Sequence, residues 1–303
     1  MNLPAGVTVK EVGPRDGLQN EEEHISTIDK IEWINQLSET GLSYIEITSF
    51  VHPKWIPQLG DAVDVAKQIN RKSGVTYAAL VPNERGLERA LEADIDEVSI
   101  FMSASEAHNQ KNINKSIRET YPVLSPVVQT AKNEGKTVRA YVSTVFGCPY
   151  DGNVKVDQAL SVCERLFEMG IDECSIGDTI GVANPLQVER VLSSLGNHFP
   201  KEKLALHFHN TRGTALANVL TALQLGYTTF DSSLGGLGGC PYAKGASGNL
   251  ATDDLLYMLE EMGIHTGIDH HKLLKSGEWI QNVVGKPLPS HHMQMLRSGG
   301  IHV

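Results

Sequence analysis

The feature that most constrains the fold is a regular alternation of short apolar segments with longer amphipathic ones. We count eight units in which a strand-like segment precedes a stretch with helical spacing of apolar residues. The predicted strands are 8–12, 44–48, 76–81, 97–102, 137–143, 173–177, 204–209 and 228–232. This alternation predicts parallel strands joined by right-handed crossovers.

Start and stop signals support the same division of the chain. The helical stretches are expected to begin near Thr27, Pro57, Glu84, Ser116, Val156, Pro185, Gly213 and Leu250. Glycines follow several of them just before the next strand, as a left-handed C-terminal cap requires: Gly41, Gly135, Gly170 and Gly226. An extra helix is predicted over 269–284, and a flexible tail over 286–303.

The choice between an open sheet and a closed barrel depends on the repeat number and on the polar residues. Eight repeats with polar residues at the strand ends favour a (β/α)8 TIM barrel, in which every βα loop opens onto one face. The 303 residues exceed the usual single domain, but barrels of ~250 residues are common. The expectation is one catalytic domain over 1–303.

Composition excludes several classes of protein. With 36 acidic and 26 basic residues, the net charge of -10 argues against a nucleic-acid or membrane surface, while a local basic site for a small anion remains possible. No apolar segment approaches the ~20 residues of a membrane span, and no signal or transit peptide is visible. Four cysteines without metal-type spacing indicate a reducing, cytoplasmic setting, with Cys148, Cys163 and Cys174 as structural residues.

Two histidines close the seventh predicted strand. Strand side chains alternate, so His207 and His209 share the inner face while Leu206 and Phe208 face the helices. Such a pair can bind a metal, or it can be a hydrogen-bonded pair in the core. The first strand is followed by Arg15 and Asp16, which offer a guanidinium for an oxyanion and a carboxylate for a metal. Such a pair in a turn is, on its own, more often a local ion pair that orders the loop, but its place at a barrel strand end favours a site role.

Two more carboxylates belong to the same rim. Glu46 faces the barrel interior from the second strand and needs a partner such as Arg15 or a metal-bound water, because an unpaired buried carboxylate costs several kcal/mol. A structural ion pair below the site is the alternative. Asp178 follows the sixth strand and is open to three roles: base, support of a neighbouring site residue, or helix cap.

A glycine-rich loop follows the eighth strand. It has six glycines among the fifteen residues 235–249 and contains Cys240. This density predicts a mobile loop suited to closing over a site or cradling an anion. The loop lacks the Gly-Lys-Ser/Thr ending of a nucleotide P-loop, and no Gly-x-Gly-x-x-Gly follows the first strand, which excludes nucleotide-dependent phosphoryl or hydride transfer.

Three motifs together carry a resemblance to a known family. The segments 13–20, 207–213 and 235–254 resemble the 3-hydroxy-3-methylglutaryl-CoA lyases, within the superfamily of barrel metallolyases and Claisen-type synthases. The likeness covers nearly the whole chain, and Gly-Gly-Cys-Pro-Tyr-Ala at 238–243 is its most lyase-specific part. The sequence departs from the family at Asp253, where eukaryotic relatives carry glutamate, so a contact made by that longer side chain is not carried over.

The resemblance implies metal-dependent retro-aldol cleavage of hydroxymethylglutaryl-CoA to acetoacetate and acetyl-CoA, a reaction of leucine degradation and ketone body formation. It implies an Mg2+ or Mn2+ cofactor and the metal ligands Asp16, His207, His209 and Asn249. It also implies a homodimer with a small CoA thioester as substrate, and no nucleic-acid or membrane partner.

The resemblance further implies catalytic roles for Arg15, Glu46, Asp178 and Cys240. Arg15 would neutralise the enolate oxygen, Cys240 would protonate the enolate carbon, and Asp178 is the candidate base. Thr48 and Thr144, with Arg15, are candidate substrate contacts. Two alternatives stay open: a condensing synthase of the isopropylmalate or citramalate type, which the cysteine-bearing loop and the lack of a long C-terminal extension oppose, and a noncatalytic barrel that binds CoA esters or a metal.

Overall fold

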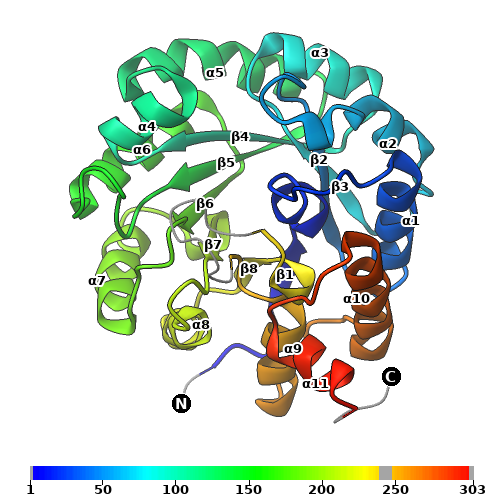
Figure 1. Cartoon of the computed structure of the whole chain (residues 1–303). Helices are drawn as coiled ribbons and strands as arrows, with labels where there is room; N and C mark the ends of the chain where they lie inside the picture. The colour runs from blue at the N-terminus through cyan, green and yellow to red at the C-terminus, as the bar shows by residue number, and fades with distance from the viewer. Residues whose placement is uncertain (1–2, 239–247, 300–303) are drawn as a thin grey trace.

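The strands close into one barrel. The computed structural model describes residues 3–238 and 248–299, and in it eight parallel strands pair in sequence order, with β8 returning to β1 (Figure 1). Every strand lies within one residue of its predicted bounds, so the predicted (β/α)8 barrel is confirmed. The strands are β1 (Thr8–Glu11), β2 (Tyr44–Ser49), β3 (Thr76–Leu80), β4 (Glu97–Ser103), β5 (Thr137–Ser143), β6 (Glu173–Asp178), β7 (Leu204–Phe208) and β8 (Thr229–Ser232).

Helices cover the outside of the barrel (Figure 1). They are α1 (Thr27–Ser38), α2 (Ala62–Gln68), α3 (Glu84–Glu92), α4 (Glu106–Ile113), α5 (Ile117–Asn133), α6 (Val156–Met169), α7 (Pro185–Gly196), α8 (Ala215–Gln224), α9 (Thr252–Glu261), α10 (His270–Val284) and α11 (His291–Arg297). The expected starts agree except that Pro57 opens a short 3-10 turn before α2, and that α4 was not predicted. Ser105 caps α4 through its hydroxyl, which accepts a hydrogen bond from the His108 N–H.

The caps explain why the helices end where they do. Gly41, Gly135, Gly170 and Gly226 all have positive φ, as the sequence predicts. At Gly41 the absence of a side chain is also required by packing, because a Cβ there would collide with the carbonyl oxygen of Gly267. The short αβ turns therefore hold each following strand in register with its neighbours.

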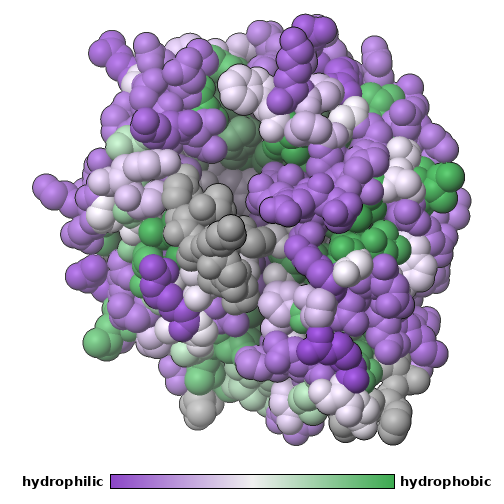
Figure 2. All heavy atoms as spheres, in the orientation of Figure 1, coloured by the Kyte–Doolittle hydropathy of each residue, from purple (hydrophilic) through white to green (hydrophobic). Residues whose placement is uncertain are grey.

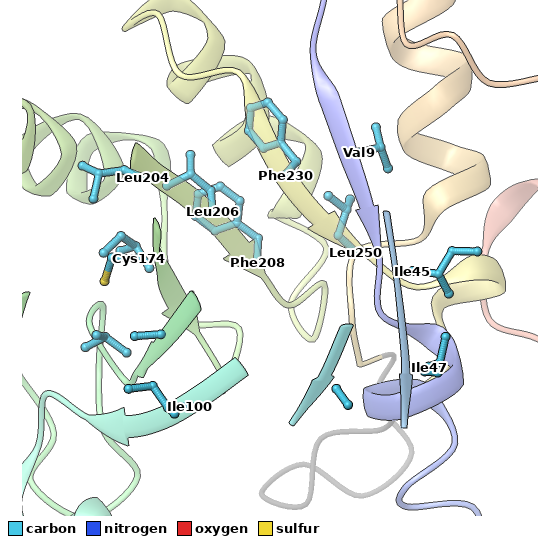
Figure 3. Packing of buried hydrophobic residues seen from close by; sticks show 14 of the residues in the cluster. Val9, Ile45, Ile47, Ile100, Cys174, Leu204, Leu206, Phe208, Phe230 and Leu250 are labelled. Atoms are coloured by element: carbon cyan, nitrogen blue, oxygen red, sulfur yellow. The ribbon is translucent and has the colours of Figure 1, made fainter. Parts of the chain in front are cut away.

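The apolar core lies between the strands and the helices. Alternate strand residues point outward into it, among them Val9, Ile45, Leu206, Phe208 and Phe230 (Figure 3). Each such side chain contributes about 1.5–3 kcal/mol when fully buried. Cys148, Cys163 and Cys174 are buried free thiols, in agreement with their predicted structural role. The inward positions carry polar residues, so the barrel interior is free to hold charged groups.

The C-terminal segment packs on the barrel's helical layer. Helix α10 contacts α1 and α9, and α11 contacts α9 and α10 (Figure 1). The Ser290 hydroxyl donates to Asp253 Oδ2 (2.5 Å), and Met293 is buried. A flexible tail was predicted over 286–303, whereas α11 docks because Leu288 and Met293 supply apolar anchors. Residues 300–303 lie outside the described part.

The surface shows how the polar residues are distributed. Hydrophilic side chains dominate the face drawn in Figure 2, and hydrophobic ones appear in small separate groups. The same face has a recess near its centre. Among the residues that the structure describes, no helix is both long enough and apolar enough to span a membrane.

Candidate active site

Four groups from distant parts of the chain meet at the carboxyl ends of β1, β7 and β8. The Asn249 side-chain amide donates to Asp16 Oδ2 (2.7 Å). His207 Nε2 lies 3.9 Å from the same oxygen and 3.2 Å from His209 Nε2. His209 and Asn249 are further joined by an isolated β-bridge. Ligand atoms of Asp16, His207 and His209 lie within 4.8 Å of one another, so the predicted ligand set forms one cluster.

A single tight turn places Arg15 and Asp16. After β1 the chain winds through the five residues Gly13–Gly17 as one π-helical turn, with Pro14 at its start. Gly13 is required here because a Cβ would meet Glu11 Oε1 at 2.6 Å and the Trp33 ring at 2.9 Å. The turn directs both side chains over the barrel mouth.

Arg15 is held by two carboxylates. Its Nε donates to Glu46 Oε2 and its Nη1 donates to Asp16 Oδ1, both at 2.5 Å. Its guanidinium lies 5.2 Å from the centroid of the Tyr141 ring, and the Tyr141 hydroxyl donates to Glu46 Oε2 (3.1 Å). The predicted contact between Glu46 and Arg15 is present, and Nη2 of Arg15 has no hydrogen-bond partner among the described residues.

Burial and neighbouring charges set the protonation states. Burial opposes ionisation of Asp16, but Arg15 and the two histidines lower the pKa of its carboxyl to about 2. Burial and the neighbouring His207 lower the pKa of His209 to about 3. Burial disfavours the Arg15 cation, yet Glu46 and Asp16 raise its pKa above its ordinary value. At neutral pH the cluster thus contains an ionised carboxylate beside a neutral imidazole.

The donor set fits a divalent cation. Asn249 Oδ1 and His209 Nδ1 are buried without a hydrogen-bond partner among the described residues. A carboxylate, an amide oxygen and two imidazoles are ligands that Mn2+ accepts and that are compatible with Mg2+. A cation among them would also separate the two Nε2 atoms, which otherwise face each other across 3.2 Å.

Asp178 lies at the same rim with a different set of contacts. Its two oxygens accept hydrogen bonds from the backbone N–H groups of Val182 (2.9 Å) and Ala183 (3.0 Å). Asn184, and not Asp178, caps α7, so the helix-cap alternative is wrong. Burial raises the pKa of Asp178 to about 6 against those hydrogen bonds and the nearby His207. A carboxyl with that pKa can exchange a proton near neutral pH.

The remaining predicted site residues differ in how they are placed. Thr48 is buried at the end of β2, and its hydroxyl has no partner among the described residues. Thr144 follows β5 with a φ of 60°, which is rare for a β-branched residue, and its hydroxyl contacts Ser103 Oγ at 2.6 Å. Cys240 lies outside the described residues.

Four inward-facing residues below the site were not singled out from the sequence. They form hydrogen bonds with the predicted residues or with one another, and they are Arg139, Tyr141, Ser175 and Asp231. Arg139 and Asp231 are buried charges at inward positions of β5 and β8. The same signal that identifies Glu46, a charge at an inward strand position, would have found both.

Comparison with known proteins agrees with this geometry. The HMGL-like family matches residues 7–280. The chain is 63% identical to hydroxymethylglutaryl-CoA lyase YngG of Bacillus subtilis over 298 residues, which is 98% of this chain and 100% of that protein. A crystal structure of the B. subtilis HMG-CoA lyase superposes with a TM-score of 0.97 at 63% identity, covering 98% of this chain and 100% of that one.

A further solved structure holds ligands. It is an HMG-CoA lyase from Acinetobacter baumannii in complex with coenzyme A and 3-methylmalate, with a TM-score of 0.93, 40% identity, and coverage of 100% of this chain and 99% of that one. The family match spans most of the chain, and the identity to a full-length relative is high. The chain therefore belongs to the HMGL-like family.

Proposed function

We propose that this chain is a hydroxymethylglutaryl-CoA lyase, which cleaves 3-hydroxy-3-methylglutaryl-CoA into acetoacetate and acetyl-CoA. In this function it is a carbon–carbon lyase that acts on a CoA thioester, and its full-length relatives carry the name of hydroxymethylglutaryl-CoA lyase. The observation that carries the proposal is the convergence of Asp16, His207 and His209 beside Arg15 in a chain so similar to these lyases. The whole chain is taken as one catalytic domain.

The proposed ligands of a divalent cation are Asp16, His207, His209 and Asn249. Such a cation, Mg2+ or Mn2+, would act as a Lewis acid and lower the pKa of the substrate's tertiary hydroxyl. Asp16 would bind it as an anion, since its pKa is lowered to about 2. His209 is neutral near pH 7 and therefore keeps a lone pair for it.

Arg15 is proposed to stabilise the charge that develops during cleavage. When the carbon–carbon bond breaks, the thioester oxygen of the acetyl-CoA enolate gains negative charge. Nε and Nη1 of Arg15 donate to Glu46 and Asp16, and these two contacts orient Nη2, which has no partner among the described residues. A fixed donor of this kind needs no reorganisation during the reaction.

Proton transfer is assigned to two groups. Asp178 is the proposed base, because its pKa of about 6 leaves it able to take a proton near neutral pH. Cys240, which lies outside the described residues, is the proposed acid for the enolate carbon. Glu46 accepts a hydrogen bond from Arg15 and so orients it. Thr48 is a proposed substrate contact through its hydroxyl, which has no partner within residues 3–238 and 248–299. Thr144 is proposed as a second one.

The other two functions considered from the sequence are less well supported. A condensing synthase would run related enolate chemistry in the bond-forming direction, but the similar full-length relatives are named as lyases. A noncatalytic barrel that binds a metal would account for the ligand cluster, but not for a buried Asp178 at the same rim whose pKa of about 6 suits proton transfer.

The test is a product assay on the purified protein. Hydroxymethylglutaryl-CoA, Mg2+ or Mn2+ and a thiol are incubated with the protein, and acetoacetate and acetyl-CoA are quantified. Equal amounts of both products support the lyase. No cleavage, or condensation when acetyl-CoA and a 2-oxo acid are supplied, would refute it. A homodimer and a cytoplasmic location complete the proposal, and sedimentation of the purified protein tests the former.

A further inference from the structure

Below the candidate metal ligands, one carboxylate joins His207 to the ion pairs of the barrel interior. Asp231 projects from β8 and is 1% exposed. Its Oδ2 lies 3.2 Å from His207 Nδ1 and accepts a hydrogen bond from the Ser175 hydroxyl (2.8 Å). Its Oδ1 accepts a hydrogen bond from Arg139 Nη2 at 2.5 Å. Both oxygens are therefore fixed by groups from three other strands.

These contacts decide which nitrogen of His207 carries a proton. Asp231 Oδ1 forms a salt bridge with the Arg139 guanidinium, and Oδ2 accepts from the Ser175 hydroxyl, so the side chain is held as a carboxylate that acts as acceptor in these contacts. An ionised carboxylate only accepts hydrogen bonds, so the contact at 3.2 Å requires a proton on His207 Nδ1. In the neutral ring, Nε2 then has a free lone pair, and Nε2 is the atom that faces Asp16 and His209.

We propose that Asp231 is a positioning residue, which holds His207 in the Nδ1–H tautomer and aims its Nε2 lone pair at the divalent cation. This inference rests on the metal site of the proposed function. Carboxylate partners of metal-binding histidines fix the tautomer and the ring orientation in this way, and their loss typically lowers metal affinity about 10- to 100-fold.

The surroundings of Asp231 make it a rigid support. Arg139 is fully buried, and its Nε also donates to Glu173 Oε1 (2.6 Å), which in turn accepts from Lys10 Nζ (2.7 Å). The Arg139 guanidinium is therefore held by Glu173 as well as by Asp231. The Tyr141 ring meets the His207 ring edge-on, with 5.9 Å between centroids, and restricts its rotation.

The first test compares two variants by direct metal binding. Asp231→Asn has nearly the same shape, but its amide can donate to Nδ1 and so stabilise the opposite tautomer. Binding of Mn2+ to the protein, followed by electron paramagnetic resonance of the free ion, should weaken about 10- to 100-fold. The matched control is Glu173→Gln, which breaks the same chain of ion pairs without touching His207 and should bind Mn2+ like the wild type.

The outcomes separate this inference from the proposed function. If the wild type binds Mn2+ and Asp231→Asn binds it equally well, Asp231 does not position the ligand. An equal loss in Glu173→Gln would assign the effect to the ion pairs in general and also overturn the inference. If the wild type itself fails to bind Mn2+ or Mg2+, the metal site of the proposed function is wrong.

A second measurement needs no variant at Asp231, which guards against a misfolded protein. Long-range proton–nitrogen NMR of the metal-free wild type reports which ring nitrogens carry protons, and the signal that disappears in a His207 variant identifies this residue among the 12 histidines. A protonated Nδ1 is the expected result. An Nδ1 without a proton would overturn the inference, whatever the activity of the enzyme.

Discussion

Replacing Arg15 by lysine tests the central electrostatic claim. The guanidinium binds Glu46 through Nε and Asp16 through Nη1, both at 2.5 Å, and leaves Nη2 for the substrate. A lysine keeps the charge, but one nitrogen atom cannot contact both carboxylates and still present a fixed third donor. Loss of a donor to a developing oxyanion lowers kcat by about 100- to 1000-fold, or roughly 2.7–4 kcal/mol.

The assay is steady-state cleavage of hydroxymethylglutaryl-CoA at saturating Mg2+ or Mn2+. Arg15→Lys should lower kcat by that factor with a much smaller change in KM, because the lost contact forms only in the transition state. The control is Arg71→Lys, in a partly exposed ion pair with Asp96 (3.3 Å), which should behave like the wild type. A rise in KM with an unchanged kcat would mean that Arg15 binds the ground state instead.

Three further predictions concern the metal, the thiol and pH. Excess EDTA should abolish cleavage, and added Mn2+ should restore it; full activity of the metal-free protein would contradict the metal assignment. Asp16→Ala and His207→Ala should lose Mn2+ binding while circular dichroism shows an intact fold. Cys240→Ser should turn over at least ~100-fold more slowly at near-normal KM, and Cys163→Ser should not; unchanged turnover of Cys240→Ser removes the acid role. Burial raises the pKa of Glu11 to about 7 against three hydrogen bonds, so its stabilising contribution is present below the unfolded pKa and is lost as pH rises through 7. The free energy of unfolding of Glu11→Gln, measured with denaturant and taken relative to the wild type, should therefore rise by about 3 kcal/mol between pH 4 and pH 8. A difference that does not change with pH would refute this prediction.

The sequence predicts the barrel because its signals are local. Each strand is a short apolar segment bounded by glycine or polar residues, and Gly41 and Gly170 mark helix ends through positive φ. Helix α4 escaped prediction because Glu106–Ile113 has little apolar periodicity and depends on its Ser105 cap. The docking of α11 escaped it because the contact between Ser290 and Asp253 spans 37 positions.

The candidate site was only partly predictable for the same reason. Asp16, His207 and Asn249 can be named from motifs, but their contacts depend on how β1, β7 and the described segment at Asn249 are placed in the barrel. Asp231 and Arg139 belong to no motif. Both could be noticed as charges at inward strand positions, but the contact between them at 2.5 Å spans 92 positions, and no local pattern encodes that contact.

The ion pairs nearest the rim give a physical reason for a cation at this place. They link the two guanidinium groups of Arg15 and Arg139 with the three carboxyl groups of Asp16, Glu46 and Asp231. By formal charge, with histidine counted as neutral, these five described residues carry an excess of one negative charge in a buried region, where an uncompensated charge costs several kcal/mol. A cation bound at Asp16 compensates that excess, whereas an anion or a neutral ligand does not. The formal charge of the interior thus favours a cation, as the oxygen and imidazole donors of the rim also do.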